Sequence, residues 1–123
     1  MKTPKPILER RRSIRLAEAL PFRIGHKDYE AEVRTQNISE HGALCIIDRN
    51  IPLMTQLAVA LTLPVEGKAK AKGKGKVLRM KGVVVRREKD PSSENYLLAI
   101  YFSEIKEPDR RALKRFIDSR LTA

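Results

Sequence analysis

The stretch Asn37-Ile38-Ser39-Glu40-His41-Gly42, followed directly by the apolar run 43–47 (Ala-Leu-Cys-Ile-Ile), decides the fold that we predict. Asn and Ser side chains hydrogen bond to nearby backbone amides, and glycine permits a positive φ, so residues 37–42 are typical of a turn. The apolar run has the composition of a buried strand. A turn that opens a buried strand indicates a small domain built from strands.

Apolar and polar residues alternate on both sides of this stretch, which predicts further strands. Phe22 and Ile24 alternate with polar neighbours, and a turn at 25–28 precedes a returning strand over 29–35. Loops are expected at 48–52 and 89–95, and later strands at 57–63, 77–87 and 96–102.

The last part of the chain changes from a strand period to a helical one. Pro108 suits the first turn of a helix, and Leu113, Phe116, Ile117 and Leu121 then form one apolar stripe. Arg110 is assigned to the opposite, polar face. The fold class that follows is mainly β: a small antiparallel six-stranded β-barrel with a C-terminal α-helix.

Composition narrows the class of protein. The 123 residues suit one domain, and a net charge of +11 with a pI near 10.2 attracts polyanions such as nucleic acid or a phosphorylated ligand. No apolar run approaches the ~18 residues of a membrane span, and no signal peptide is evident. The lone Cys45, expected to pack in the barrel, fits a reducing cytoplasm.

The sequence offers little for catalysis or metal binding. One cysteine and two histidines (His26 and His41) make a zinc site within one chain unlikely to form, and no nucleophile has an evident base partner. His41 is interpreted as an exposed loop residue, and Arg86 and Arg87 as a solvated strand end. We therefore expect no enzymatic activity, no metal and no cofactor.

A second motif precedes the strands: Arg11-Arg12-Ser13-Ile14-Arg15, an RxxxR inside the basic run that begins at Arg10. A guanidinium binds phosphate or the O6/N7 edge of guanine in bidentate fashion and stacks on a base. Asn37 offers an amide oxygen to guanine N–H groups, Ser39 can bond phosphate, a base edge or its own turn, and Gly42 allows close backbone approach. Both motifs therefore carry groups that bind phosphate and the edge of a base.

RxxxR followed by [D/N]xSxxG resembles the ligand-binding signature of the PilZ domain family, the bacterial receptors for cyclic di-GMP. The resemblance covers roughly residues 9–121, and we assign 1–8 to a flexible tail and 9–123 to the domain. It implies a PilZ-like split barrel in which Arg11 and Arg15 hold phosphate and guanine, while Asn37, Ser39 and Gly42 form the opposite wall. Arg10 stands just before the RxxxR motif. In the family, an arginine at that place is associated with binding of two ligand molecules that intercalate with each other.

The resemblance also implies a function: a cytoplasmic receptor whose segment Arg10–Arg15 orders when cyclic di-GMP binds and which signals through a protein partner. The lysine-rich stretch 68–76 departs from the family plan. It is expected to be a mobile hairpin or loop, and its ends are candidates for strand. It keeps two alternatives open. One is a basic β-barrel that binds nucleic acid non-specifically, and the other is a PilZ-fold adaptor that binds proteins without ligand.

Overall fold

The structure is a computed structural model that describes residues 15–64 and 75–122. The described elements are six strands and one helix, in the order β1 (Pro21–His26), β2 (Tyr29–Ile38), β3 (Gly42–Ile47), β4 (Gln56–Pro64), β5 (Gly75–Lys89), β6 (Tyr96–Ile105) and α2 (Glu107–Thr122). The tail predicted for residues 1–8, Arg10, Arg11 and most of the lysine-rich stretch lie outside the described residues.

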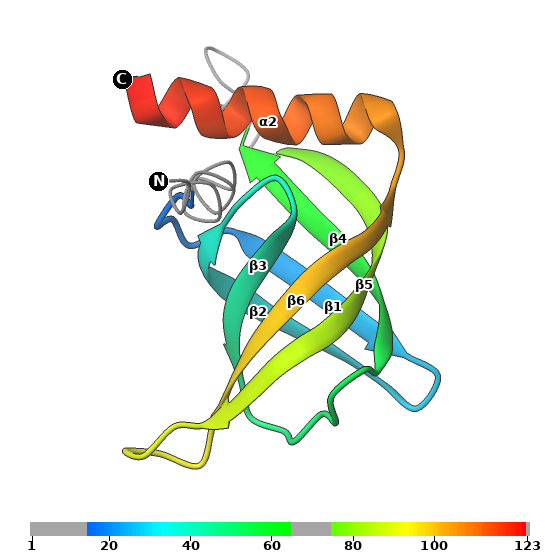
Figure 1. The fold of residues 1–123 in the computed structure, drawn as a ribbon, viewed down its shortest axis with the longest axis vertical. Coiled ribbons are helices and arrows are strands. Elements are labelled where there is room, and N and C mark those ends of the chain that lie inside the picture. Colours follow the sequence, from blue (N-terminus) through cyan, green and yellow to red (C-terminus); the bar gives the residue numbers. More distant parts are fainter. Residues whose placement is uncertain (1–14, 65–74, 123) are drawn as a thin grey trace, which may run out of the picture.

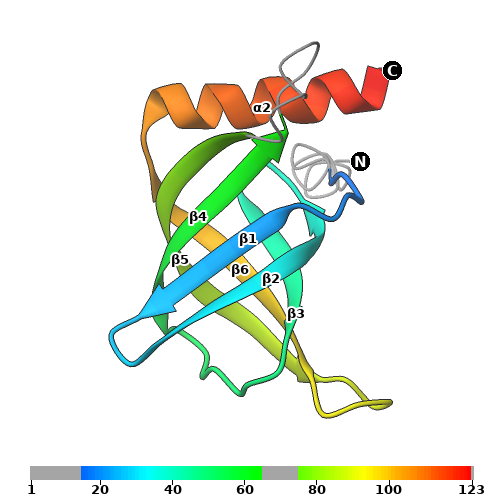
Figure 2. The same ribbon diagram turned by 180° about the vertical axis from the view of Figure 1, so that it is seen from behind.

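The six strands close into a barrel in the order β1-β2-β3-β6-β5-β4, and every neighbouring pair is antiparallel. Helix α2 lies across one end of this barrel (Figures 1 and 2). The predicted fold class, a six-stranded antiparallel barrel with a C-terminal helix, is confirmed.

Alternation along the strands places the core inside the barrel. Phe22 and Ile24 of β1 are almost completely buried, as are Leu98, Ile100 and Phe102 of β6. From the helix, Leu113, Phe116 and Ile117 join the same core. The prediction that Leu121 continues this stripe is wrong. Leu121 is 47% exposed, because it lies in the last turn of α2.

Strands β2, β4, β5 and β6 all extend beyond the ranges that their sequence patterns predict. Strand β5 covers 15 residues because its first residues pair with the end of β4, and its last residues pair with the start of β6. Gly75 and Lys76 therefore belong to a strand, as expected for the end of the lysine-rich stretch. Strand β2 continues through Asn37 and Ile38, so the turn predicted for 37–42 is reduced to Ser39–His41.

Candidate functional site

The segment that leads into the barrel, residues 15–20, is held against β2 by backbone hydrogen bonds. Leu16 and Ile38 exchange two of them, at 2.8 and 2.9 Å. Further along, the buried Thr35 hydroxyl donates to the Glu18 carbonyl (2.6 Å) and accepts from the Leu20 amide (2.9 Å). These contacts fix the path of the chain just after Arg15.

The two sequence motifs meet at one hydrogen bond. The Arg15 guanidinium donates to the amide oxygen of Asn37 through Nη1, at 2.7 Å. A register shift between Thr35 and Asn37 produces this geometry, since a β-bulge re-aims the side chains that follow it. Thr35 and Ile38 both point into the core, three residues apart, so Asn37 is left half-buried on the outer surface beside Arg15.

The turn between β2 and β3 is held by its own polar groups. The Ser39 amide donates to the Gly42 carbonyl (2.8 Å), and the buried Ser39 hydroxyl accepts from the His41 amide (3.2 Å). That hydroxyl also lies 3.3 Å from the Gly42 carbonyl. Of the three roles weighed for Ser39, the structure places it in the local one, bonding its own turn.

Gly42 is required by packing rather than by a positive φ. Its φ is outside the left-handed region, but a Cβ at this position would lie 2.4 Å from the carbonyl oxygen of Ile100 on the paired strand β6. No real Cβ contact is this short, so any side chain here would force the two strands apart. The close backbone approach that glycine allows at position 42 is made to strand β6.

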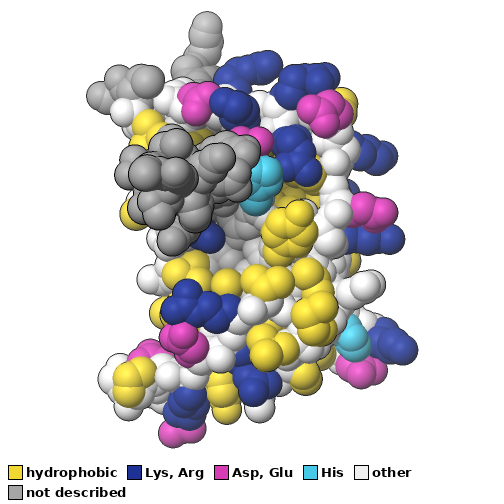
Figure 3. Space-filling view, in the orientation of Figure 1, with side chains coloured by type: hydrophobic (Ala, Val, Ile, Leu, Met, Phe, Trp, Pro, Cys, Tyr) yellow, Lys and Arg dark blue, Asp and Glu magenta, His cyan; other side chains and the backbone are white. Residues whose placement is uncertain are grey.

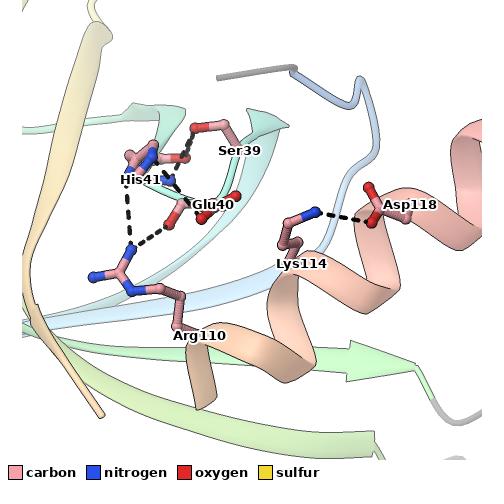
Figure 4. A network of polar contacts seen from close by, with 7 residues as sticks. Ser39, Glu40, His41, Arg110, Lys114 and Asp118 are labelled. Atoms are coloured by element: carbon pink, nitrogen blue, oxygen red, sulfur yellow. Dashed lines mark hydrogen bonds and ion pairs between the residues drawn. The ribbon is translucent and has the colours of Figure 1, made fainter. Parts of the chain in front are cut away.

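The helix contributes a residue to this turn that the sequence analysis assigned elsewhere. Arg110 was placed on the solvent face of α2, yet its guanidinium reaches the Glu40 carbonyl (3.4 Å) and His41 Nδ1 (3.5 Å), as Figure 4 shows. The signal was available: Arg110 precedes the buried Leu113 by three residues, so both lie on the same helix face. His41, expected to be an exposed loop residue, is half-buried by this contact.

Beside the turn, the barrel surface is hollowed by a depression of about 390 Å³, within the range of small-molecule sites, roughly 300–1,000 Å³. We call it the motif depression; its lining residues are Arg15, Ser39, His41, Gly42, Val85, Ala99, Ile100 and Tyr101. Figure 3 shows hydrophobic side chains gathered on this face, over β3, β5 and β6.

The motif depression joins two kinds of surface. Arg15 and His41 lie at its polar side, while Val85 and Tyr101, 52% and 49% exposed, supply an apolar side. A cation next to an aromatic and aliphatic floor suits a ligand that carries both phosphate and a flat base. The sequence analysis missed Val85, Ala99 and Tyr101. The sequence did contain a signal for Tyr101: it occupies an outward position of β6, between the inward Ile100 and Phe102.

The predicted site residues divide into three groups. Arg15, Ser39 and Gly42 line the motif depression, and Asn37 stands behind Arg15 as its hydrogen-bond partner. Arg10 and Arg11 lie outside the described residues. Arg86 is exposed and pairs with Glu88, while Arg87 is exposed, in agreement with a solvated strand end.

Other reactive groups in the described ranges do not form a site. Cys45 is buried as predicted, and burial raises the pKa of its thiol from 9.0 to about 12, which leaves it protonated and unreactive. Among the residues that the structure describes, no three His, Cys, Asp or Glu side chains are grouped as metal ligands. Over the same residues, no helix is both long enough and apolar enough to span a bilayer.

The chain is similar in sequence to one protein family and in fold to several solved structures. The family model of the PilZ domain matches residues 9–119. Among solved structures, the chain is similar to the Bacillus subtilis inhibitor of motility (MotI/DgrA), with a TM-score of 0.77 and 24% identity over 92% of this chain and 51% of that one. No curated protein matches the chain.

Two further structures share the fold. The PilZ domain of YcgR from Escherichia coli, solved with c-di-GMP, has a TM-score of 0.61 and 18% identity, over 89% of this chain and 90% of that one. MrkH of K. pneumonia has a TM-score of 0.67 and 17% identity, over 89% of this chain and 48% of that one. The chain thus spans about half the length of MotI/DgrA and of MrkH, and identities this low establish likeness of fold.

Proposed function

Because this chain belongs to the PilZ domain family, we propose that it is a receptor for cyclic di-GMP without catalytic activity of its own. One observation carries the proposal: the Arg15 guanidinium is hydrogen bonded to Asn37, so the two motifs meet at the motif depression. The similarity in fold to a YcgR domain solved with c-di-GMP supports the choice of ligand.

In the proposed complex, Arg15 binds a phosphate or the O6/N7 edge of a guanine, and a base lies over Val85 and Tyr101. Asn37 holds the guanidinium in position and accepts from guanine N–H groups. Charge-assisted hydrogen bonds contribute roughly 1.5–3 kcal/mol each, and stacking about 1–3 kcal/mol per base. A few such contacts would supply the binding free energy of a ligand with a micromolar Kd, about −8 kcal/mol.

Arg10 and Arg11 complete the proposed ligand set. Arg11 would contact phosphate from the same segment as Arg15, and Arg10 would hold a second, intercalated ligand molecule. The response we propose is that cyclic di-GMP orders the segment Arg10–Arg15 against Asn37, Ser39 and Gly42. The backbone bonds between Leu16 and Ile38 support this response, because they anchor the end of that segment next to the motif depression.

A protein partner would then recognise the surface formed by the ordered segment and the ligand. Ordering a segment costs conformational entropy, so ligand affinity should depend on how strongly the segment is already constrained. Just after that segment, the chain is constrained by the backbone bonds between Leu16 and Ile38 and by the contacts of Thr35 with Glu18 and Leu20.

Isothermal titration of cyclic di-GMP into the full chain and into Arg15→Ala tests the proposal. Loss of one charge-assisted contact should weaken binding about 10- to 100-fold. Arg115→Ala is the matched control, since Arg115 is an exposed arginine of α2 with no hydrogen bond or ion pair among the described residues.

Equal binding by Arg15→Ala and the wild type would contradict the proposed site. Absence of binding by the wild type, with tight binding of an oligonucleotide, would favour the nucleic-acid alternative. The number of ligand molecules bound per chain, compared between the wild type and Arg10→Ala, tests the intercalated pair.

A further inference from the structure

A second hollow lies on another wall of the barrel, where β1, β2 and β4 face the viewer in Figure 2. It has a volume of about 330 Å³ and shares no lining residue with the motif depression. Three arginines from three different strands border it: Arg23 of β1, Arg34 of β2 and Arg79 of β5. We call this hollow the β4 groove.

The strand register explains why a groove forms here. Ala60 of β4 pairs with Arg23 on one side and with Arg79 on the other. Along the middle of β4, the outward residues Ala58, Ala60 and Thr62 have short side chains, so the long arginines of the neighbouring strands stand above a low floor. A trough therefore follows β4, with guanidinium groups along both of its sides.

The groove has more positive than negative charge. Glu32 is its one lining carboxylate, and it pairs with Arg23 in an exposed ion pair. The Arg34 guanidinium donates to the Ala19 carbonyl, at 3.3 Å. The Arg79 guanidinium has no hydrogen bond or ion pair with the residues that the structure describes.

We propose that the β4 groove binds an extended acidic segment of a partner protein. The planar fork of a guanidinium matches a carboxylate, and the Arg23–Glu32 pair shows that a carboxylate fits between these strands. In an extended segment, alternate side chains lie about 6.6 Å apart on one face. Arg23 and Arg79 both pair with Ala60, so one carboxylate of the segment can face both of them. Arg34 pairs with Pro21, two residues from Arg23 along β1, so the next carboxylate on that face can lie near Arg34.

Two features of the β4 groove favour an acidic peptide over a nucleic acid. Phe22, the aromatic residue of its lining, is 1% exposed and has no face for a base to stack on. Val77, 45% exposed, instead offers an apolar contact for an aliphatic side chain. The inference does not depend on cyclic di-GMP, because the groove and the motif depression are separate.

Fluorescence anisotropy with a labelled ten-residue peptide of alternating Glu and Ala tests the proposal at physiological salt, using the full chain. The double variant Arg23→Gln/Arg79→Gln should bind this probe about 10-fold more weakly than the wild type. The matched control, Arg87→Gln/Arg115→Gln, removes the same charge from two exposed arginines outside the groove, so each variant has a net charge of +9 instead of +11. It should bind like the wild type.

A second variant keeps the arginines and fills the floor. Ala60→Glu places a carboxylate between Arg23 and Arg79, and should also weaken binding of the peptide. Thermal unfolding of each variant, followed by circular dichroism, checks that the barrel is intact.

Equal loss in the groove variant and in the matched control would overturn the proposal, because net charge alone would then explain the affinity. No binding of the Glu-Ala peptide by the wild type, or equal binding of a Gln-Ala peptide, would overturn it as well. Tighter, groove-dependent binding of an oligothymidylate would assign the groove to nucleic acid. Self-association that the groove variant abolishes would assign it to a second copy of the chain.

Discussion

The motif depression and the β4 groove are both arginine-bordered hollows on the same barrel, but their polar groups are held differently. In the motif depression, Arg15 is bonded to Asn37, and Ser39 and His41 are fixed by the turn and by Arg110. In the β4 groove, the Arg79 guanidinium has no hydrogen bond or ion pair with the described residues, and the Arg23 guanidinium has an exposed ion pair with Glu32. The polar groups of the motif depression are therefore held in a defined geometry, whereas the β4 groove mainly presents exposed positive charge.

This difference predicts different kinds of recognition. Groups held by a backbone network are positioned before the ligand arrives, so they discriminate by shape and hydrogen bonding. Exposed guanidinium groups contribute to association mainly through charge, and salt weakens their effect. If the comparison is right, the wall of the motif depression is firmly fixed, and the two hollows respond differently to salt.

The largest effect concerns Cys45, which lies on the inner side of β3, the strand that Gly42 opens. Because burial raises the pKa of its thiol from 9.0 to about 12, the thiolate fraction near pH 8 falls about 1,000-fold. Alkylation by iodoacetamide, measured by mass spectrometry, should be slower in the native protein by at least about this factor than in urea. Similar rates in both states would show that β3 opens readily.

The same pKa gives a sign for stability. Between pH 9 and pH 12 the unfolded thiol loses its proton while the native thiol keeps it, so its contribution to stability is present below pH 9 and is lost as the pH rises through this range. The wild type should therefore lose more stability than Cys45→Ala over that range, as measured by urea unfolding.

Next in size is Gly42→Ala. The added Cβ meets the Ile100 carbonyl oxygen at 2.4 Å, so β3 and β6 must separate, at a cost of about 3 kcal/mol in the free energy of unfolding. In thermal unfolding this corresponds to a loss of about 10 °C. Gly25→Ala is the matched control, because its Cβ would meet only side-chain atoms of Glu30, from 3.5 Å. Equal losses in both variants would argue against the packing role of Gly42.

Thr35→Val tests the anchor of the Arg15 segment. It leaves the buried Leu20 amide and the Glu18 carbonyl without their hydroxyl partner, which should cost about 1–2 kcal/mol of stability. Affinity for cyclic di-GMP should fall as well, because residues 18–20 lose their contacts with Thr35 and the chain that carries Arg15 is then held only by the Leu16–Ile38 bonds and the Arg15–Asn37 bond. Thr62→Val, at a half-buried threonine whose hydroxyl makes no hydrogen bond among the described residues, should change neither quantity. A loss of stability with unchanged affinity would separate the anchor from the site.

The smallest effect is a difference in salt dependence. Between about 50 and about 300 mM NaCl, affinity for cyclic di-GMP should fall only a few-fold, while affinity of the groove for the Glu-Ala peptide should fall about 10-fold. Equal slopes in the two titrations would remove the distinction between a geometrically fixed hollow and an electrostatic one.

Much of the fold was predictable because strands and their buried faces follow from the alternation of apolar and polar residues over short stretches of sequence. Alternation at Phe22 and Ile24, and at Leu98, Ile100 and Phe102, is local information that selects a strand and its buried face. The end of β2 was not predictable in the same way. A bulge between Thr35 and Asn37 changes which side chains face outward, and it depends on the pairing of β2 with β3.

The two motifs, the basic charge and the alternation that predicts strands follow from the sequence alone, since they depend only on residue types and their spacing. The tertiary structure alone decided that Arg15 meets Asn37, that Arg110 reaches His41 and that Tyr101 borders the motif depression. It also decided that Arg23, Arg34 and Arg79 border one groove. The physical reason is that barrel closure brings together residues from distant strands, and strand register, which sequence patterns leave open, selects which side chains become neighbours.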